Sequence, residues 1–105
     1  MTYPSQTPEL VKKLNSNSPA SGLDKLSFFF KLQDAINKRL ITGEVKIVAL
    51  SHFYESDHFY VATGYAKVAD VLKPMRVEIL PTIRKVIVRI GVIVVDFPLE
   101  EVDVE

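Results

Sequence analysis

The stretch Leu26–Leu50, LSFFFKLQDAINKRLITGEVKIVAL, decides the fold, because it predicts a long amphipathic helix and a strand that returns along it. At 100° per residue, the apolar side chains of residues 26–41 fall on one broad arc. Gly43 fits a left-handed helix stop, and Val45–Leu50 indicates an interior strand. The arc is too wide for one sheet face, so we expect part of it to meet a second helix or a second subunit. Its members are Phe28, Phe29, Phe30, Leu32, Ala35, Ile36, Leu40 and Ile41.

Residues 51–63 allow two interpretations. The triplet His-Phe-Tyr occurs at residues 52–54 and again at 58–60, on either side of Glu55-Ser56-Asp57. One interpretation is a hairpin with those three polar residues at its tip, and the other is a long loop that leads into a helix.

The second half of the chain predicts one helix and two strands. We expect the helix from about Gly64 to Lys73, ended by the proline that follows. Arg76–Leu80 alternates as a strand does, and Ile83–Val95 indicates one long strand in which Gly91 marks a bulge. The apolar stripe of the expected helix consists of Tyr65, Val68 and Leu72.

These elements predict a two-layer α+β or α/β sandwich, with two main helices packed on a small mixed sheet. The N-terminal part contains three prolines and many polar residues, so we expect residues 1–21 to form a flexible arm. Residues 22–98 are then the single α/β domain, and residues 99–105 an acidic C-terminal tail.

The charge is balanced overall but unevenly distributed. The chain of 105 residues has thirteen basic and thirteen acidic side chains, and five acids without a base follow from Asp96 on, so residues 1–95 carry a formal charge of +5. A basic body with an acidic tail suits binding to a polyanion, although a short acidic terminus can also serve solubility alone.

The chain has no cysteine, which excludes disulfides, thiol catalysis and cysteine-based zinc sites. We see no secretory signal or membrane-length apolar run, and expect a cytoplasmic protein.

Several short motifs follow one another along the chain: Lys25, Phe29-Phe30, Glu44-Val45, Ala49-Leu50 and the run Val68-Ala69-Asp70-Val71-Leu72-Lys73. Together they resemble the Alba family of small dimeric nucleic-acid-binding proteins. The resemblance covers roughly Lys25 to Ile79 and implies an Alba-like sandwich that works as a homodimer. It also implies that Lys25 lies in a lysine-bearing turn, and that Arg84, Lys85 and Arg89 form a basic arm on the terminal hairpin. The chain departs from the family pattern at Ser51–Tyr60, which is longer than the corresponding turn and lacks Arg and Gly, and it shows no clear strand before the first helix.

The resulting hypothesis is non-enzymatic binding of DNA or RNA, largely through the phosphate backbone. Phosphate contacts would come from cations, and base stacking from exposed aromatic rings. The alternative for each aromatic residue is burial in the core or in a subunit interface. The candidates are the cations Lys25, Lys46, Arg76, Arg84, Lys85 and Arg89 and the aromatic residues Phe53 and Tyr54, with Phe59 and Tyr60 beside them.

Other classes of function have less support in the sequence. His52, Glu55, Asp57 and His58 have side chains that bind zinc, nickel or iron, but their spacing matches no strong motif, and we expect no metal and no other cofactor. We expect no catalysis, because the chain shows no phosphate-binding glycine loop and no nucleophile elbow. The main alternative to nucleic-acid binding is a small oligomeric subunit that interacts with proteins.

Overall fold

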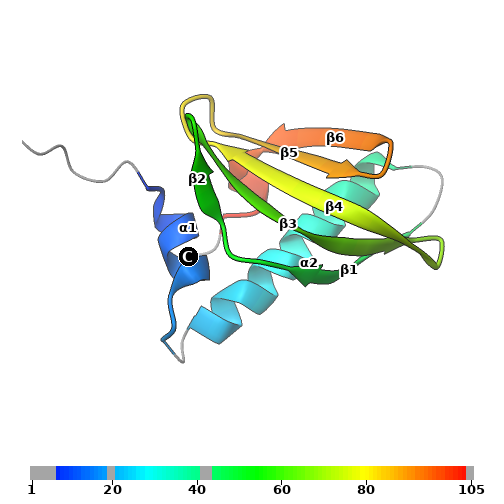
Figure 1. Ribbon diagram of the computed structural model, residues 1–105, viewed down its shortest axis with the longest axis horizontal. Helices are drawn as coiled ribbons and strands as arrows, with labels where there is room; N and C mark the ends of the chain where they lie inside the picture. Colours follow the sequence, from blue (N-terminus) through cyan, green and yellow to red (C-terminus); the bar gives the residue numbers. More distant parts are fainter. Residues whose placement is uncertain (1–6, 19–20, 41–43, 104–105) are drawn as a thin grey trace, which may run out of the picture.

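The computed structural model describes residues 7–18, 21–40 and 44–103, which form an α+β fold of two layers (Figure 1). One layer holds helix α2 (Ser21–Arg39) with the shorter helix α1 (Glu9–Asn15) beside it. The other layer is a six-stranded sheet, and α2 crosses one of its faces. The strands are β1 (Val45–Leu50), β2 (Tyr54–Ser56), β3 (Phe59–Val68), β4 (Val71–Leu80), β5 (Lys85–Ile90) and β6 (Ile93–Pro98), and a 3-10 helix, η1 (Leu99–Glu101), follows.

The sheet has the order β1-β3-β4-β5-β6, and β2 pairs with β3 next to the end of β1. Strand β1 is thus an edge strand, so the interior strand that we expected at Val45–Leu50 is wrong. All five pairings are antiparallel, so the mixed sheet that we expected is wrong. Strands β2 to β6 follow one another through short turns, and a short turn reverses the direction of the chain.

The helix predicted within residues 26–41 is confirmed as α2, which begins at Ser21 and ends at Arg39. Phe30 is exposed although it belongs to the predicted apolar arc, whereas Ile41 and the expected stop at Gly43 lie outside the described residues. Helix α1 packs against α2 and is the second helix that the wide arc required. The fully buried face of α2 consists of Phe28, Leu32, Ala35 and Ile36.

Helix α1 lies inside residues 1–21, the segment that we expected to be a flexible arm. Its apolar side chains Leu10, Val11 and Leu14 are buried in the core, so residues 9–15 are part of the folded domain. The Asn15 amide then joins α1 to the sheet layer: Nδ2 donates to the Phe53 carbonyl oxygen at 2.7 Å, and Oδ1 accepts from the Phe53 N–H at 3.1 Å.

The hairpin interpretation of residues 51–63 is confirmed. Tyr54 pairs with Val61 and Ser56 with Phe59, so the chain reverses at Asp57-His58. The turn thus lies one residue later than the polar tip that we considered.

The helix predicted from Gly64 to Lys73 is wrong. Residues 59–68 are β3 and residues 71–80 are β4, joined by a turn at Ala69-Asp70. The run Val68–Lys73, which resembles the Alba second helix, therefore spans the end of one strand, the turn and the start of the next.

The single long strand predicted over Ile83–Val95 is also wrong. It is a hairpin of β5 and β6, with Ile90 paired to Ile93 across a turn at Gly91-Val92. Gly91 has a positive φ of 59° at the first central position of this turn, which is where type II′ hairpins favour glycine.

Residues 99–103 of the predicted acidic tail pack against the domain. Leu99 and Val102 are buried, and the Glu101 carboxylate accepts hydrogen bonds from both terminal nitrogens of Arg39, at 2.5 and 3.1 Å. The Arg39 guanidinium also lies 5.2 Å from the centre of the Phe97 ring. None of the described helices is long and apolar enough to cross a membrane.

Candidate nucleic-acid interface

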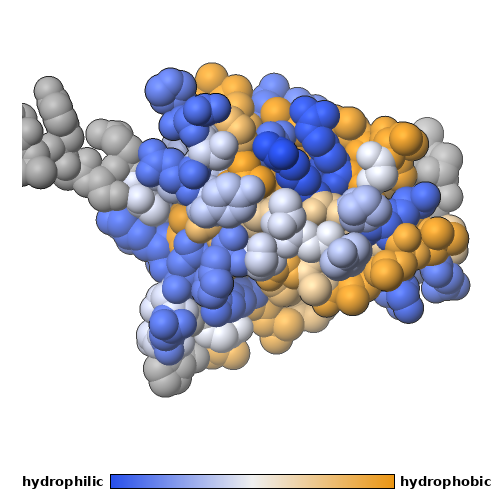
Figure 2. All heavy atoms as spheres, viewed as in Figure 1, coloured by the Kyte–Doolittle hydropathy of each residue, from blue (hydrophilic) through white to orange (hydrophobic). Residues whose placement is uncertain are grey.

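The sheet face that points away from α2, here called the outer face, holds most of the predicted binding residues. In antiparallel pairs, directly opposed residues point to the same side of the sheet. Buried Ala62 opposes buried Val77 on the side of α2, so their neighbours Thr63 and Arg76 point to the other side. Figures 1 and 2 view the molecule from this outer side, with α2 behind the sheet.

Five basic side chains from four strands share the outer face, against two acids, Glu78 and Asp96. Lys46 opposes Lys67, Arg76 opposes Arg89, and the parity of β5 puts Lys85 on the same side as Arg89. The strands of this face thus carry a formal excess of three positive charges. Figure 2 shows hydrophilic side chains over the middle and the left end of the face, and hydrophobic side chains toward its right end. The five bases are Lys46, Lys67, Arg76, Lys85 and Arg89.

At the centre of the outer face, two arginines share one carboxylate. Arg76 Nη2 lies 3.3 Å from Glu78 Oε2, and Arg89 Nε lies 3.4 Å from Glu78 Oε1. Glu78 is only 8% exposed, whereas about half of each arginine side chain is exposed. The group keeps one net positive charge, and both guanidinium groups remain accessible to a ligand.

Lys46 and Lys67 lie directly opposite each other on β1 and β3. Like charges in such a pair destabilise a sheet. Neither lysine has an ion pair in the described part of the chain, although Glu44 and Asp70 line the same shallow hollow. An anion bound between the two ammonium groups would relieve their repulsion.

Two tyrosines accompany the cations. Tyr54 is 54% exposed and Tyr65 is 53% exposed, and both point to the outer face because they pair with Val61 and Pro74 there. Phe53, in contrast, is buried and meets the Phe28 ring edge-on at 5.8 Å, so the burial alternative is confirmed for it. Tyr60 is buried as well, and Phe59 is partly buried.

A hollow of about 470 Å³ lies beside Tyr65 on the outer face. Thr63, Arg76 and Arg89 line it together with the backbone at Gly64 and Gly91. The hollow brings an exposed aromatic ring and two guanidinium groups to one opening, which is the combination that stacks a base and holds its phosphate.

Three predicted cations do not strengthen this interface. Lys25 is on α2, in the other layer of the fold. Lys85 Nζ lies 3.1 Å from Asp96 Oδ2, and Arg84 forms an ion pair with Glu100. The Arg84 guanidinium donates a hydrogen bond to Glu100 and holds the pKa of that carboxyl below its usual value. Acids beyond Val95 thus neutralise two cations of the expected basic arm.

The four residues that we considered as metal ligands, without expecting a metal, are not placed to bind one ion together. Asp57 and His58 form the turn between β2 and β3, whereas the His52 imidazole Nδ1 lies 3.3 Å from Asn15 Oδ1. Within the described ranges, no group of three or more His, Asp or Glu side chains is placed to hold one metal ion.

Two residues of the interface were missed at the level of sequence. Lys67 and Tyr65 fell in the segment predicted as a helix, where Lys67 had no role and Tyr65 belonged to the apolar stripe. Alternation of exposed and buried residues along a strand would have placed both outside, but the turn that ends this strand has no glycine or asparagine to mark it.

No family model, curated protein or solved structure matches the chain.

Proposed function

We propose that this protein binds single-stranded DNA or RNA through the outer face of its sheet. The observation that carries the proposal is the convergence of four cations from four strands with two half-exposed tyrosines on one open face. The four cations are Lys46, Lys67, Arg76 and Arg89. Cations neutralise backbone phosphates without regard to sequence, and aromatic rings stack on any base. A single strand can present both groups at once to an open sheet.

The ion pairs on this face do not prevent binding. The arginine side chains that contact Glu78 are 45% and 52% exposed, so each guanidinium group keeps N–H donors for a phosphate while Glu78 stays paired. A phosphate can therefore share these guanidinium groups at low cost. Lys46 and Lys67, which repel each other, gain most from an anion.

The first test is a salt series with a fluorescein-labelled oligothymidylate or oligouridylate, followed by fluorescence anisotropy. Each phosphate contact with a single strand contributes about 0.7 to the slope of log K against log salt. Replacing Lys46→Ala and Lys67→Ala together should reduce this slope by about 1.4. Tyr65→Ala should weaken binding about tenfold, through lost stacking.

A double variant on α2, Lys31→Ala with Lys38→Ala, is the matched control, because it removes the same charge from the other layer of the fold. It should leave the slope unchanged. Equal loss in both double variants would show that only net charge matters, and an absence of binding at low salt would overturn the proposal.

A second candidate function, self-association or binding to another protein, is favoured by a separate observation. The outer face is apolar toward the end where the β3–β4 and β5–β6 turns lie (Figure 2). Val92 is 97% exposed, and Leu72 and Val94 are each 55% exposed. Exposed apolar side chains that gather at one end of a face often mark an interface.

A further inference from the structure

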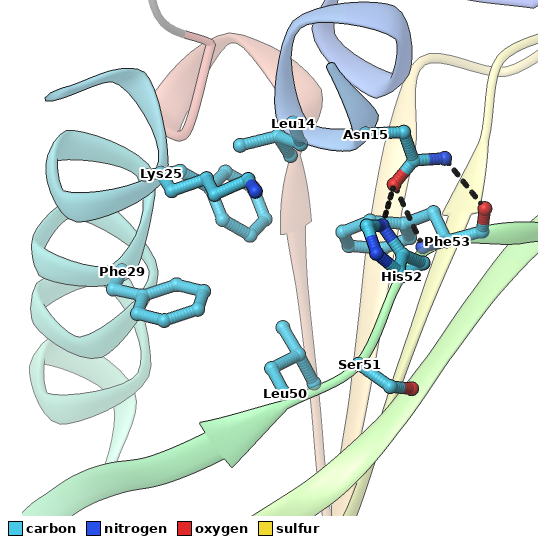
Figure 3. Close-up of a pocket in the computed structure, with 9 residues that line it drawn as sticks. Leu14, Asn15, Lys25, Phe29, Leu50, Ser51, His52 and Phe53 are labelled. Carbon is cyan, nitrogen blue, oxygen red and sulfur yellow. Dashed lines mark hydrogen bonds between the residues drawn. The ribbon is translucent and has the colours of Figure 1, made fainter. Parts of the chain in front are cut away.

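We propose that the hollow between α1, α2 and the β1–β2 connection binds a small organic carboxylate with an aromatic or aliphatic body. This site is on the opposite layer from the outer face and is independent of nucleic-acid binding. Figure 3 shows the hollow, with α2 on one side and the β1–β2 connection on the other.

The body of the ligand is specified by an apolar lining. The hollow has a volume of about 220 Å³ and is lined by Leu14 from α1, Phe28 and Phe29 from α2, and Leu50 and Phe53 from the sheet layer. Pockets for drug-sized ligands have about 300–1,000 Å³, so this one fits a smaller molecule. The partly buried Phe29 ring, backed by the buried rings of Phe28 and Phe53, favours a flat apolar group, such as a phenyl ring.

The walls are held in place before any ligand arrives. The Asn15 side chain makes two hydrogen bonds to the Phe53 backbone, which fix the end of α1 against the β1–β2 connection. The Phe28 ring packs edge-on against Phe53 at 5.8 Å and lies 6.2 Å from the Phe29 ring. A preformed pocket spends little free energy on ordering when it binds.

The polar group of the ligand is specified by Lys25. Figure 3 shows its amine at the hollow, on the side of Leu14. The other cations of α2 have partners: Lys31 donates to the Asp103 carbonyl oxygen, Lys38 pairs with Asp34, and Arg39 pairs with Glu101. Within the described residues, Lys25 has no such partner. An ammonium group without a counterion beside an apolar hollow is complementary to an anion with an apolar body.

The charge of the ligand follows from the number of donors. Among the described residues that line the hollow, Lys25 is the one lysine or arginine, and the neighbouring polar side chains are Asn15, Ser51 and His52. The Asn15 amide is already engaged by the Phe53 backbone, and the Ser51 hydroxyl donates to the Thr63 carbonyl oxygen at 3.0 Å. One ammonium group therefore matches a single carboxylate better than a phosphate ester with two charges.

The test uses phenylacetate as the probe and phenylacetamide, which has nearly the same shape without the charge, as the comparison. Binding is followed by calorimetry and by NMR shifts of the backbone amides of Phe29, Ser51 and His52. Phenylacetate should bind with a dissociation constant on the order of 1 mM. Lys25→Met keeps the apolar stem and should weaken phenylacetate binding about tenfold or more, without changing the affinity for phenylacetamide.

Two control variants make the outcome decisive. Lys38→Met removes a lysine from the same helix but away from the hollow, and it should leave phenylacetate binding unchanged. Leu50→Trp should fill the hollow and abolish binding of both probes, and a thermal unfolding curve checks that this variant is folded. Equal affinity for phenylacetate and phenylacetamide would overturn the inference, as would shifts confined to the outer face or no binding at all.

Discussion

Gly64 is a position at which the backbone of β1 lies close against β3. A Cβ atom at this position would lie 1.9 Å from the Ala49 carbonyl oxygen and 2.9 Å from the Leu50 Cα. Both are backbone atoms, so no side-chain rotation can relieve the overlap. The register between β1 and β3 also shifts between Ile47 and Ala49, which indicates that β1 bends here to approach β3.

We therefore predict that Gly64→Ala destabilises the protein by about 2 kcal/mol or more, because the β1 backbone must move away. Urea unfolding followed by circular dichroism measures this change. Gly22→Ala is the matched control, since Gly22 lies in α2 with no atom within 4 Å of its added Cβ. That variant should gain up to about 1 kcal/mol from helix propensity. Equal stability of the two variants would contradict the close approach at Gly64.

At the scale of elements, the sequence predicted α2 and the strand β1, although β1 is an edge strand and not the interior strand that we expected. It left the hairpin at residues 51–63 as one of two alternatives. The periodicity of α2 is strong because its buried side chains recur over several turns of helix. Helix α1 was missed because Leu10, Val11 and Leu14 fit one helical turn or a short strand equally well. Most residues of the candidate site were named individually from the sequence. Their common location on the outer face of the sheet was not predicted.

The β3–β4 hairpin could not be predicted because its turn lacks the residues that mark such turns. Ala69 has φ of 50° and Asp70 has φ of 66°, whereas turns with two positive φ values usually contain Asn-Gly or Asp-Gly. Without that mark, the spacing of Tyr65, Val68 and Leu72 favoured a helix. The β5–β6 turn does contain Gly91, but a single glycine between β-branched residues indicates a bulge as readily as a reversal.

The unusual turn gives a prediction of its own. Alanine in the left-handed region costs about 1 kcal/mol, and glycine does not. Ala69→Gly should therefore stabilise the protein by about 0.5–1 kcal/mol, measured by thermal and urea unfolding. Ala66→Gly is the matched control, because Ala66 is buried inside β3 and should be destabilised by the same exchange. A loss of stability in Ala69→Gly would show that the turn has another conformation in solution.

At the scale of the whole molecule, the two faces of the sheet differ in their surroundings: the inner face packs in the core, and the outer face is exposed. The inner face and the helices enclose the core, and the docking of Leu99 and Val102 extends this core to the C-terminal segment. The outer face keeps a charged middle and an apolar end. The uneven charge of the chain was visible in the sequence, but the pairing of Arg84 and Lys85 with Glu100 and Asp96 depends on how the last strand returns along β5.

The apolar end of the outer face predicts self-association. If it is an interface, Leu72→Ser combined with Val92→Ser should shift a dimer to the monomer in sedimentation velocity without loss of stability, because both side chains are more than half exposed. Leu23→Ser is the matched control, since Leu23 is 75% exposed on α2. A wild-type protein that stays monomeric at high concentration would exclude this interface.

The order of the elements along the chain has a consequence during synthesis. Both helices leave the ribosome before any strand, so the apolar side of α2, with Phe28, Leu32 and Ile36, emerges with no sheet to cover it. The strands from β2 on can pair with their sequence neighbours as soon as each hairpin is made. The apolar face of α2 therefore stays exposed on the nascent chain until the sheet has formed. During this interval a ribosome-bound chaperone would bind that face.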